Sequence, residues 1–232
     1  MGDISVDVIQ KDIKNVHLSV HPPSGRVRIS APLRLSLETI RTFAISKLRW
    51  IKQQQGKLHV QERETPREYL DRESHYVWGR RYLLQLIEEN ESPRVELSHK
   101  RLILHIRPAT TVARKEEILD DWYRQLIRET APDLIAKWQR NIGVSVSSIF
   151  VQNMKTKWGS CNALSGHIRL NTELAKKPPH CLEYIVVHEL VHFIERHHGD
   201  RFKSLMDRYL PPWRSYRDEL NRFPLSHKNW TY

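Results

Sequence analysis

The sequence predicts an α+β fold, in which a small β-sheet with one helix is followed by a part that combines helices with a short sheet. Three observations support this prediction. Apolar residues alternate with polar ones in short N-terminal segments, as half-buried strands require. Apolar residues recur at helical spacing over residues 118–138 and again over residues 182–193. Because Arg107-Pro108 ends the first region, we expect a β-rich domain over residues 1–107 and a second domain over residues 108–232.

The first domain opens with a predicted hairpin. Strands over residues 16–20 and 27–31 flank the turn-forming stretch His21-Pro-Pro-Ser-Gly25. Ser36 is a suitable N-cap for an amphipathic helix that ends in the polar stretch Gln53-Gln-Gln-Gly56. The polar segment that follows is expected to be a connector. Four more short strands are expected, at Tyr76–Trp78, Tyr82–Ile87, Val95–Leu97 and Leu102–Ile106.

A long helix is expected to begin the second domain. Its apolar spacing starts at Ile118, Pro132 is expected to kink or restart it, and Gly143 is a suitable C-cap. Strands are expected over residues 144–151 and 167–171. A second apolar helix follows Pro178-Pro179, which is a favourable pair for a helix start.

This second apolar helix carries the pattern H-E-x-x-H at His188, Glu189 and His192. Residues four apart on a helix lie about 40° from each other around its axis, so both imidazoles can bind one metal ion. Glu189 is offset from them by about 100°, so its carboxylate can reach a water on that ion without binding the ion itself. The pattern therefore predicts a metal-dependent hydrolase with Glu189 as the general base.

A catalytic zinc site usually needs a third protein ligand. Glu195 shares the helical face of the two histidines but would lie about 10 Å along the axis from His188, which is too far for metal bonds of about 2 Å. His198 follows His192 by six positions, the interval of the metzincin pattern H-E-x-x-H-x-x-G-x-x-H, although Glu195 replaces the glycine. We take His198 as the third ligand and His197 as the alternative.

Composition excludes several classes of protein. The net charge of +11 is spread over both halves of the chain, which favours weak, non-specific attraction to polyanions rather than sequence-specific nucleic-acid binding. No apolar run reaches the length of a membrane span, and the N-terminus lacks the apolar core of a signal peptide. Two cysteines, Cys161 and Cys181, match no zinc-ribbon spacing and no disulfide scaffold, so we expect two ordinary thiols and a cytoplasmic location.

Four motifs follow one another along the second half of the chain. They are Lys157-Trp-Gly-Ser-Cys161, Ile168-x-Leu-Asn171, Tyr184-Ile-Val-Val-His-Glu-Leu-Val-His192 and His198-x-x-x-Phe202. Their order resembles one known family, the YgjP-type metal-dependent hydrolases, which are zincin-like relatives of the SprT and WLM metalloproteases. The likeness extends to the N-terminal region through Val27-x-Ile-x-Ala-Pro32 and Trp50-Ile51. It implies a zincin-like catalytic domain with a helix and an antiparallel sheet, ligands His188, His192 and His198, and Glu189 as the catalytic residue. It also implies that the loop of Trp158 borders the site.

The sequence thus predicts a peptidase with one zinc ion per chain, or another divalent transition metal in its place, acting on polypeptides. Trp158 is interpreted as a wall for the substrate, Gly159 as a point of close approach, and Lys157 and Arg201 as substrate-binding cations. One alternative is a nucleotide phosphohydrolase that holds phosphates with such cations, although no P-loop or carboxylate cluster for Mg²⁺ is present. Another is a non-catalytic adaptor in which zinc only stabilises the fold, which a closed four-ligand site would indicate. The oligomeric state stays open.

Overall fold

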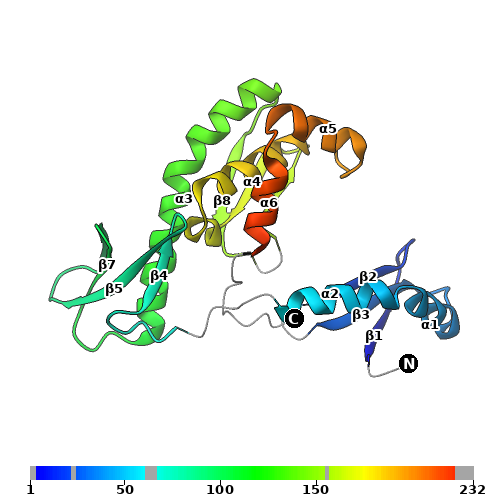
Figure 1. The fold of residues 1–232 in the computed structure, drawn as a ribbon, viewed down its shortest axis with the longest axis horizontal. Helices are drawn as coiled ribbons and strands as arrows, with labels where there is room; N and C mark the ends of the chain where they lie inside the picture. The colour runs from blue at the N-terminus through cyan, green and yellow to red at the C-terminus, as the bar shows by residue number, and fades with distance from the viewer. Residues whose placement is uncertain (1–3, 22–24, 61–66, 155–156, 223–232) are drawn as a thin grey trace. The chain divides into compact units, whose positions relative to one another are not determined.

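The computed structural model describes residues 4–21, 25–60, 67–154 and 157–222, with no side chains for residues 57–60. Within these ranges it shows six α-helices, one 3-10 helix and three small sheets, which confirms the predicted α+β class (Figure 1). The described residues fall into two compact units, the first before residue 61 and the second from Arg67 onward. Each has its own hydrophobic core.

The first unit is a three-stranded sheet with two helices. The predicted hairpin is confirmed, because β2 (His17–His21) pairs antiparallel with β3 (Arg26–Pro32). The predicted turn at residues 22–24 lies outside the described residues. Strand β1 (Val6–Lys11), which the sequence analysis did not separate from the hairpin, pairs parallel with β3 on its other side. The core of this unit is small and consists of Ile29, Ala31, Ile40 and Ala44.

The helical part of the first unit begins as predicted but is interrupted. The Ser36 hydroxyl accepts a hydrogen bond from the backbone N–H of Thr39, which confirms the N-cap of α1 (Leu37–Ser46). The chain leaves helical geometry at Lys47, where φ is −103° and ψ is 5°. A second helix, α2 (Leu48–Val60), follows immediately, so the predicted single helix is two.

The second unit contains a four-stranded sheet in the order β4-β5-β7-β6, which confirms all four predicted strands. Strands β4 and β5 are joined by a tight turn in which Trp78 and Gly79 both have positive φ, at 50° and 76°. A two-residue turn of this kind matches the right-handed twist of the two strands. The bounds are β4 (Ser74–Val77), β5 (Arg80–Glu88), β6 (Arg94–Ser98) and β7 (Arg101–Ile106).

The long helix α3 (Val112–Ile142) spans 31 residues and includes Pro132 without a break, so the helix does not restart there. Gly143 ends it in the left-handed conformation at φ 80°, which confirms the predicted C-cap. The predicted boundary at residue 107 falls inside the second unit, because β7 and α3 contribute to the same core. The buried residues of α3 recur every three or four positions and so form one face of the helix. They are Leu119, Tyr123, Ile127, Ala131, Ile135, Trp138 and Ile142.

A second sheet of this unit has the order β8-β10-β9, and it lies against helix α4 (Pro179–Val191). Strand β10 (His167–Asn171) pairs parallel with β8 (Ser148–Gln152) and antiparallel with β9 (Gly159–Asn162), so the sheet is mixed. Strand β9 was not predicted. The 3-10 helix η1 (Thr172–Lys176) leads from β10 toward α4. Two further helices, α5 (Asp200–Tyr209) and α6 (Trp213–Arg222), pack against α4.

Helix α4 is apolar on every side, and the structure explains why. Pro179 occupies its first turn, and α4 contacts α3, α5, α6, β9 and β10. A helix that is apolar around its whole circumference is stable only when neighbours cover it on all sides. Residues from Cys181 to Val191 on this helix are therefore almost all buried. His188 and His192 therefore lie at the end of a helix that is packed into the core.

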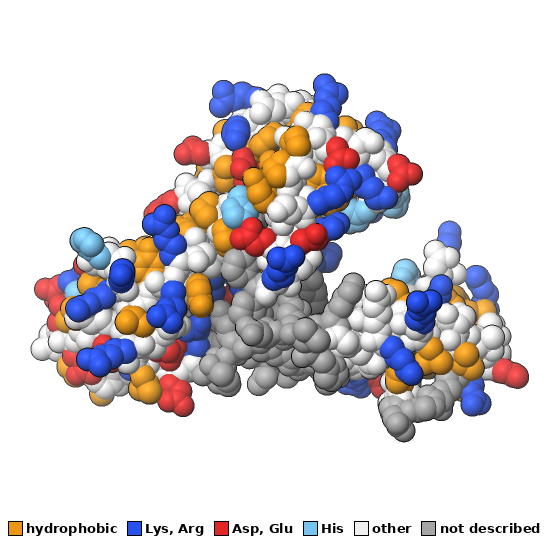
Figure 2. Space-filling view, viewed as in Figure 1, with side chains coloured by type: hydrophobic (Ala, Val, Ile, Leu, Met, Phe, Trp, Pro, Cys, Tyr) orange, Lys and Arg blue, Asp and Glu red, His pale blue; other side chains and the backbone are white. Residues whose placement is uncertain are grey.

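On the face shown in Figure 2, the positive charge of the described residues does not gather into a single stripe. Figure 2 shows Lys and Arg side chains scattered over the face in view, with Asp and Glu between them. Within the described residues, none of the helices combines the length and the apolar character needed to cross a bilayer.

Candidate metal centre

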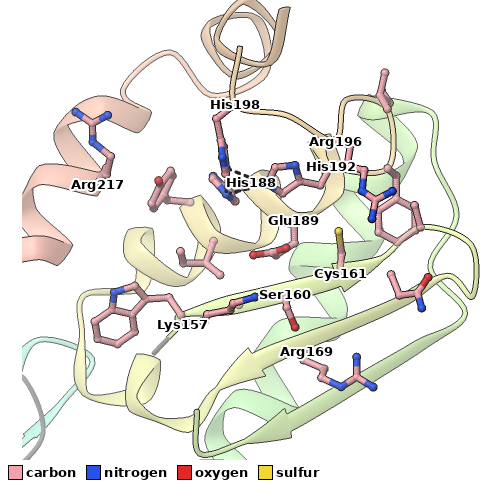
Figure 3. Close-up of a pocket in the computed structure, with 18 of the residues that line it drawn as sticks. Lys157, Ser160, Cys161, Arg169, His188, Glu189, His192, Arg196, His198 and Arg217 are labelled. Carbon is pink, nitrogen blue, oxygen red and sulfur yellow. Dashed lines mark hydrogen bonds between the residues drawn. The ribbon is translucent and has the colours of Figure 1, made fainter. Parts of the chain in front are cut away.

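Three imidazoles converge at the C-terminal end of α4 (Figure 3). His188 lies in its last turn, His192 is its C-cap, and His198 lies in the loop that precedes α5. The Nε2 atom of His192 lies 3.2 Å from that of His188 and 3.0 Å from that of His198. The Nε2 atoms of His198 and His188 are 3.1 Å apart. The end of the helix at Val191 lets the chain turn back and bring His198 to the other two.

Local contacts orient these rings. The Nδ1 atom of His192 donates a hydrogen bond to the backbone carbonyl of Glu195 at 3.0 Å, which leaves the lone pair of this neutral ring on Nε2. Phe202 is buried, and its ring centroid lies 5.0 Å from that of His188 and 4.7 Å from those of His192 and His198. Tyr184 also contacts the His188 ring edge-on. The aromatic contacts restrict how the three imidazoles can rotate.

Burial keeps His188 and His192 neutral. It lowers the pKa of His188 to about 3, with a further contribution from the nearby His192 and His198. Burial also lowers the pKa of His192. A histidine whose pKa lies below its ordinary value of about 6.5 is neutral at pH 7 and offers a lone pair to a metal. The Nδ1 atom of His188 is buried and has no hydrogen-bond partner among the described residues.

The donor set fits a tetrahedral zinc ion. Nitrogen ligands about 2.0–2.1 Å from such an ion lie about 3.3 Å from one another. The three Nε2 atoms here are 3.0–3.2 Å apart, which is close to that value. Three imidazoles on one ion leave a fourth position open, as catalytic zinc sites require. These three residues form a group of candidate metal ligands in the described part of the chain.

Glu189 lies beside the imidazoles on the sheet side of α4, between the helix and β9 (Figure 3). Its side chain is almost fully buried. Burial raises the pKa of its carboxyl to about 7, although a hydrogen bond from the Cys161 thiol and the charge of Lys157 act in the opposite direction. A carboxyl with a pKa near 7 exchanges protons readily at neutral pH.

Strand β9 approaches Glu189 closely because Gly159 has no side chain. A Cβ atom at this position would lie 2.8 Å from Oε1 of Glu189 and 2.8 Å from Cγ2 of Ile185. The predicted role of Gly159 as a point of close approach therefore has a specific partner, the Glu189 carboxylate. Two residues on, the Cys161 thiol donates its hydrogen bond to the same carboxylate.

Both cysteines are free thiols, as predicted, but Cys161 also has a specific partner in Glu189. Burial and the nearby Glu189 carboxylate raise the pKa of Cys161 to about 12, so it remains a protonated donor. Gly159 and Cys161 share one face of β9, since alternate residues of a strand point the same way. The sequence pattern did not indicate this contact, because β9 is not recognisable as a strand from its residues alone.

The remaining candidates divide into two groups. Lys157 and Trp158 line a cavity of about 1040 Å³ that also contains the imidazoles and Glu189. Arg201 does not line this cavity. It is an exposed residue on α5, and its Nε atom is 3.8 Å from Oε2 of Glu195. His197, the alternative third ligand, is exposed and lies outside the converging group, with its backbone N–H donating to Glu195.

A buried helix carrying H-E-x-x-H, followed by a turn that returns a third histidine, is the arrangement typical of zinc-dependent hydrolases. The chain matches the family model of the YgjP-like metallopeptidase domain over residues 14–223. It therefore belongs to this metallopeptidase family, as the motifs predicted, and this membership implies a catalytic metal.

Two solved structures are similar to part of the chain. The metallopeptidase zymogen jannalysin of Methanocaldococcus jannaschii has 23% identity and a TM-score of 0.35, over 38% of this chain and 91% of that one. The metallopeptidase zymogen abylysin of Pyrococcus abyssi has 19% identity and a TM-score of 0.35, over 40% of this chain and 98% of that one. No curated protein matches the chain.

Proposed function

We propose that the protein is a zinc-dependent peptidase, in which His188, His192 and His198 hold one ion and Glu189 is the general base. The observation that carries this proposal is the convergence of three imidazole nitrogens within 3.2 Å of one another, beside a buried carboxylate. Family membership supports the peptidase class.

A bound zinc ion would supply Lewis acidity and lower the pKa of water toward about 7. The residues of the chain supply the rest. Glu189 accepts the proton of the attacking water and passes it to the leaving nitrogen. Its raised pKa lets the carboxyl both accept and release a proton at neutral pH. Cys161 and the space left by Gly159 hold the Glu189 carboxylate in place. Burial of α4 and the contacts of the Phe202 ring restrict the imidazoles before substrate binds.

Strand β9 offers a binding edge for an extended polypeptide. It is the outermost strand of the sheet β8-β10-β9, so one of its edges pairs with no other strand among the described residues. An extended peptide can add to such an edge through backbone hydrogen bonds. Because β9 contacts α4 and contains both Gly159 and Cys161, a peptide paired with it would run past Glu189.

The alternatives are less well supported. A nucleotide phosphohydrolase has no support from the family, which is one of peptidases. A closed structural zinc site needs a fourth protein ligand, and the candidate group in the described residues offers three.

One panel tests the proposal. Zinc-loaded wild type and Glu189→Gln would each be offered denatured casein and the four nucleoside triphosphates, with products detected by mass spectrometry. We expect the wild type to cleave casein and Glu189→Gln to retain zinc but lose about 10²–10⁴-fold in rate, because an amide cannot accept the proton. Cleavage of triphosphates alone by the wild type would overturn the peptidase proposal, and full activity of Glu189→Gln would overturn the assigned base.

A further inference from the structure

The cavity around the imidazoles is lined by side chains of very unequal charge. Glu189 is the one carboxylate among the described residues that line it. The cationic residues come from four separate places, namely the segment before β9, strand β10, the loop after α4, and α6. They are Lys157, Arg169, Arg196 and Arg217.

Among the described residues, three of these cations form no salt bridge, although Lys157 is near enough to Glu189 for its charge to lower the pKa of that carboxyl. Arg217 donates to the Asp218 carboxylate at 3.0 Å, which offsets its charge. For Lys157, Arg169 and Arg196, the described residues provide no Asp or Glu oxygen within 4.0 Å. Arg169 is held over the ring of Phe150, with 5.5 Å from its guanidinium carbon to the ring centroid. Its charge is therefore positioned by an aromatic contact and not by a carboxylate.

The cations lie on more than one side of the imidazoles (Figure 3). Arg217 lies to the left of Glu189, Arg196 lies to the right, and Lys157 lies below Glu189. Arg169 lies further below on β10, and because it pairs with Ser160 its side chain is on the face of the sheet opposite to Gly159 and Cys161. A concave surface with one sign of charge concentrates the electric field and attracts the opposite charge.

We propose that this cavity selects polypeptides with acidic side chains near the cleaved bond, an inference that rests on the proposed peptidase function. Arg169 and Arg196 can each receive a carboxylate through two parallel hydrogen bonds, and Lys157 can attract one as a point charge. Peptides rich in Lys and Arg are repelled by the same groups. The cations recognise the side chains of the substrate, while the backbone of the substrate pairs with β9.

Matched peptides test the preference. A peptide that contains a bond cleaved in casein would be made in two forms, with Asp or Glu beside that bond or with Asn or Gln in the same positions. We expect each acidic residue to raise kcat/KM of the zinc-loaded wild type about fivefold at low salt. We expect the advantage to shrink as NaCl is added, since salt screens exposed charges.

Substitution of the cavity cations tests which of them causes the preference for the acidic peptide. Arg169→Gln and Arg196→Gln should lower the preference for the acidic peptide, whereas Arg128→Gln, an exposed arginine on α3 outside the cavity, should not. Arg196→Glu should shift the preference toward a peptide with Lys in place of the acidic residue. Zinc content and circular dichroism would confirm that each variant keeps its site and its fold.

The outcomes separate this inference from the proposed function. Equal cleavage of the acidic and amide peptides, or an equal effect of Arg128→Gln, would overturn the inference and leave the peptidase function standing. Binding of the same peptides to zinc-loaded Glu189→Gln gives a readout without turnover, and equal affinity for both forms would also overturn it. Tighter binding of a nucleoside triphosphate than of the acidic peptide would contradict the inference, and absence of any peptide cleavage would remove both proposals.

Discussion

At the scale of single residues, His198 is the side chain whose position depends most on how the chain turns. His188 and His192 are four residues apart at one helix end, so their convergence follows from helical geometry. His198 reaches them only because the helix ends at Val191 and the loop returns before Gly199. The six-residue interval suggested this ligand, and its Nε2 atom lies 3.0 Å and 3.1 Å from the other two.

The purified protein should therefore carry about one zinc ion per chain. Alanine at His188, His192 or His198 should each remove it, because two imidazoles alone hold zinc weakly. His197→Ala is the matched control in the same loop, and it should retain the metal since His197 lies outside the converging group. Metal analysis that shows loss in His197→Ala and retention in His198→Ala would reverse the assignment.

Gly159 gives a prediction about packing rather than ligation. In Gly159→Ala the added Cβ atom would meet Oε1 of Glu189 and Cγ2 of Ile185 at 2.8 Å, so the strand or the carboxylate must shift. We expect the free energy of unfolding to fall by about 1–3 kcal/mol and peptidase activity to fall with it. Gly56→Ala on α2, where a Cβ atom meets nothing within 4 Å, should leave activity unchanged. Urea unfolding and casein cleavage measure both effects, and wild-type activity in Gly159→Ala would contradict the role assigned to this close approach.

At the scale of elements, the sequence predicted most of the fold where apolar periodicity is strong. The long helix, the four strands after residue 73 and the N-cap at Ser36 follow from spacing and from known cap residues. Strand β9, Gly159–Asn162, has neither length nor apolar alternation, and it is a strand because β10 provides its hydrogen bonds. Tertiary pairing of this kind leaves no signal in a single sequence. The contact between Cys161 and Glu189 was missed for the same reason.

Helix α3 contains Pro132 in its interior, where proline is unfavourable. Pro132 lacks the N–H that would bond the carbonyl of Arg128, yet the helix continues because its buried face packs along its whole length. Pro132 itself is exposed. Pro132→Ala should therefore raise the free energy of unfolding by about 1–2 kcal/mol, after allowing for the greater freedom it gives the unfolded chain.

The matched control for this helix is Glu129→Ala, a change at another exposed position of α3, which should alter stability by less than about 0.5 kcal/mol. Denaturant unfolding compares the two variants, and zinc content should be the same in both. A loss of stability in Pro132→Ala would show that the packing of α3 depends on the geometry that the proline imposes.

At the scale of the whole molecule, the two units have separate cores, and all three candidate ligands belong to the second. The four-stranded sheet shares its core with α3 and α4, since Leu84, Leu102 and Leu104 belong to the same cluster as Leu119 and Leu190. The sheet of the first unit has its own cluster around Ile29 and Ile40. The family match over residues 14–223 includes residues of both units.

Removal of the metal should destabilise the core of the second unit and leave that of the first unchanged. A ligand that binds only the folded state stabilises it by about 4 kcal/mol at 1,000 times its dissociation constant, so chelation should destabilise the unit that contains the site. We expect hydrogen exchange in the presence of a chelator to accelerate in α3, α4 and the four-stranded sheet together, because they share one core. Exchange in β1, β2 and β3 should not change. The contrary result is that exchange in β4 to β7 stays as slow as without chelator, as in the first unit, while exchange in α3 and α4 accelerates. The folding boundary would then lie at residue 107, as the change of sequence pattern suggested. In that case the shared core would not unfold as one cooperative unit.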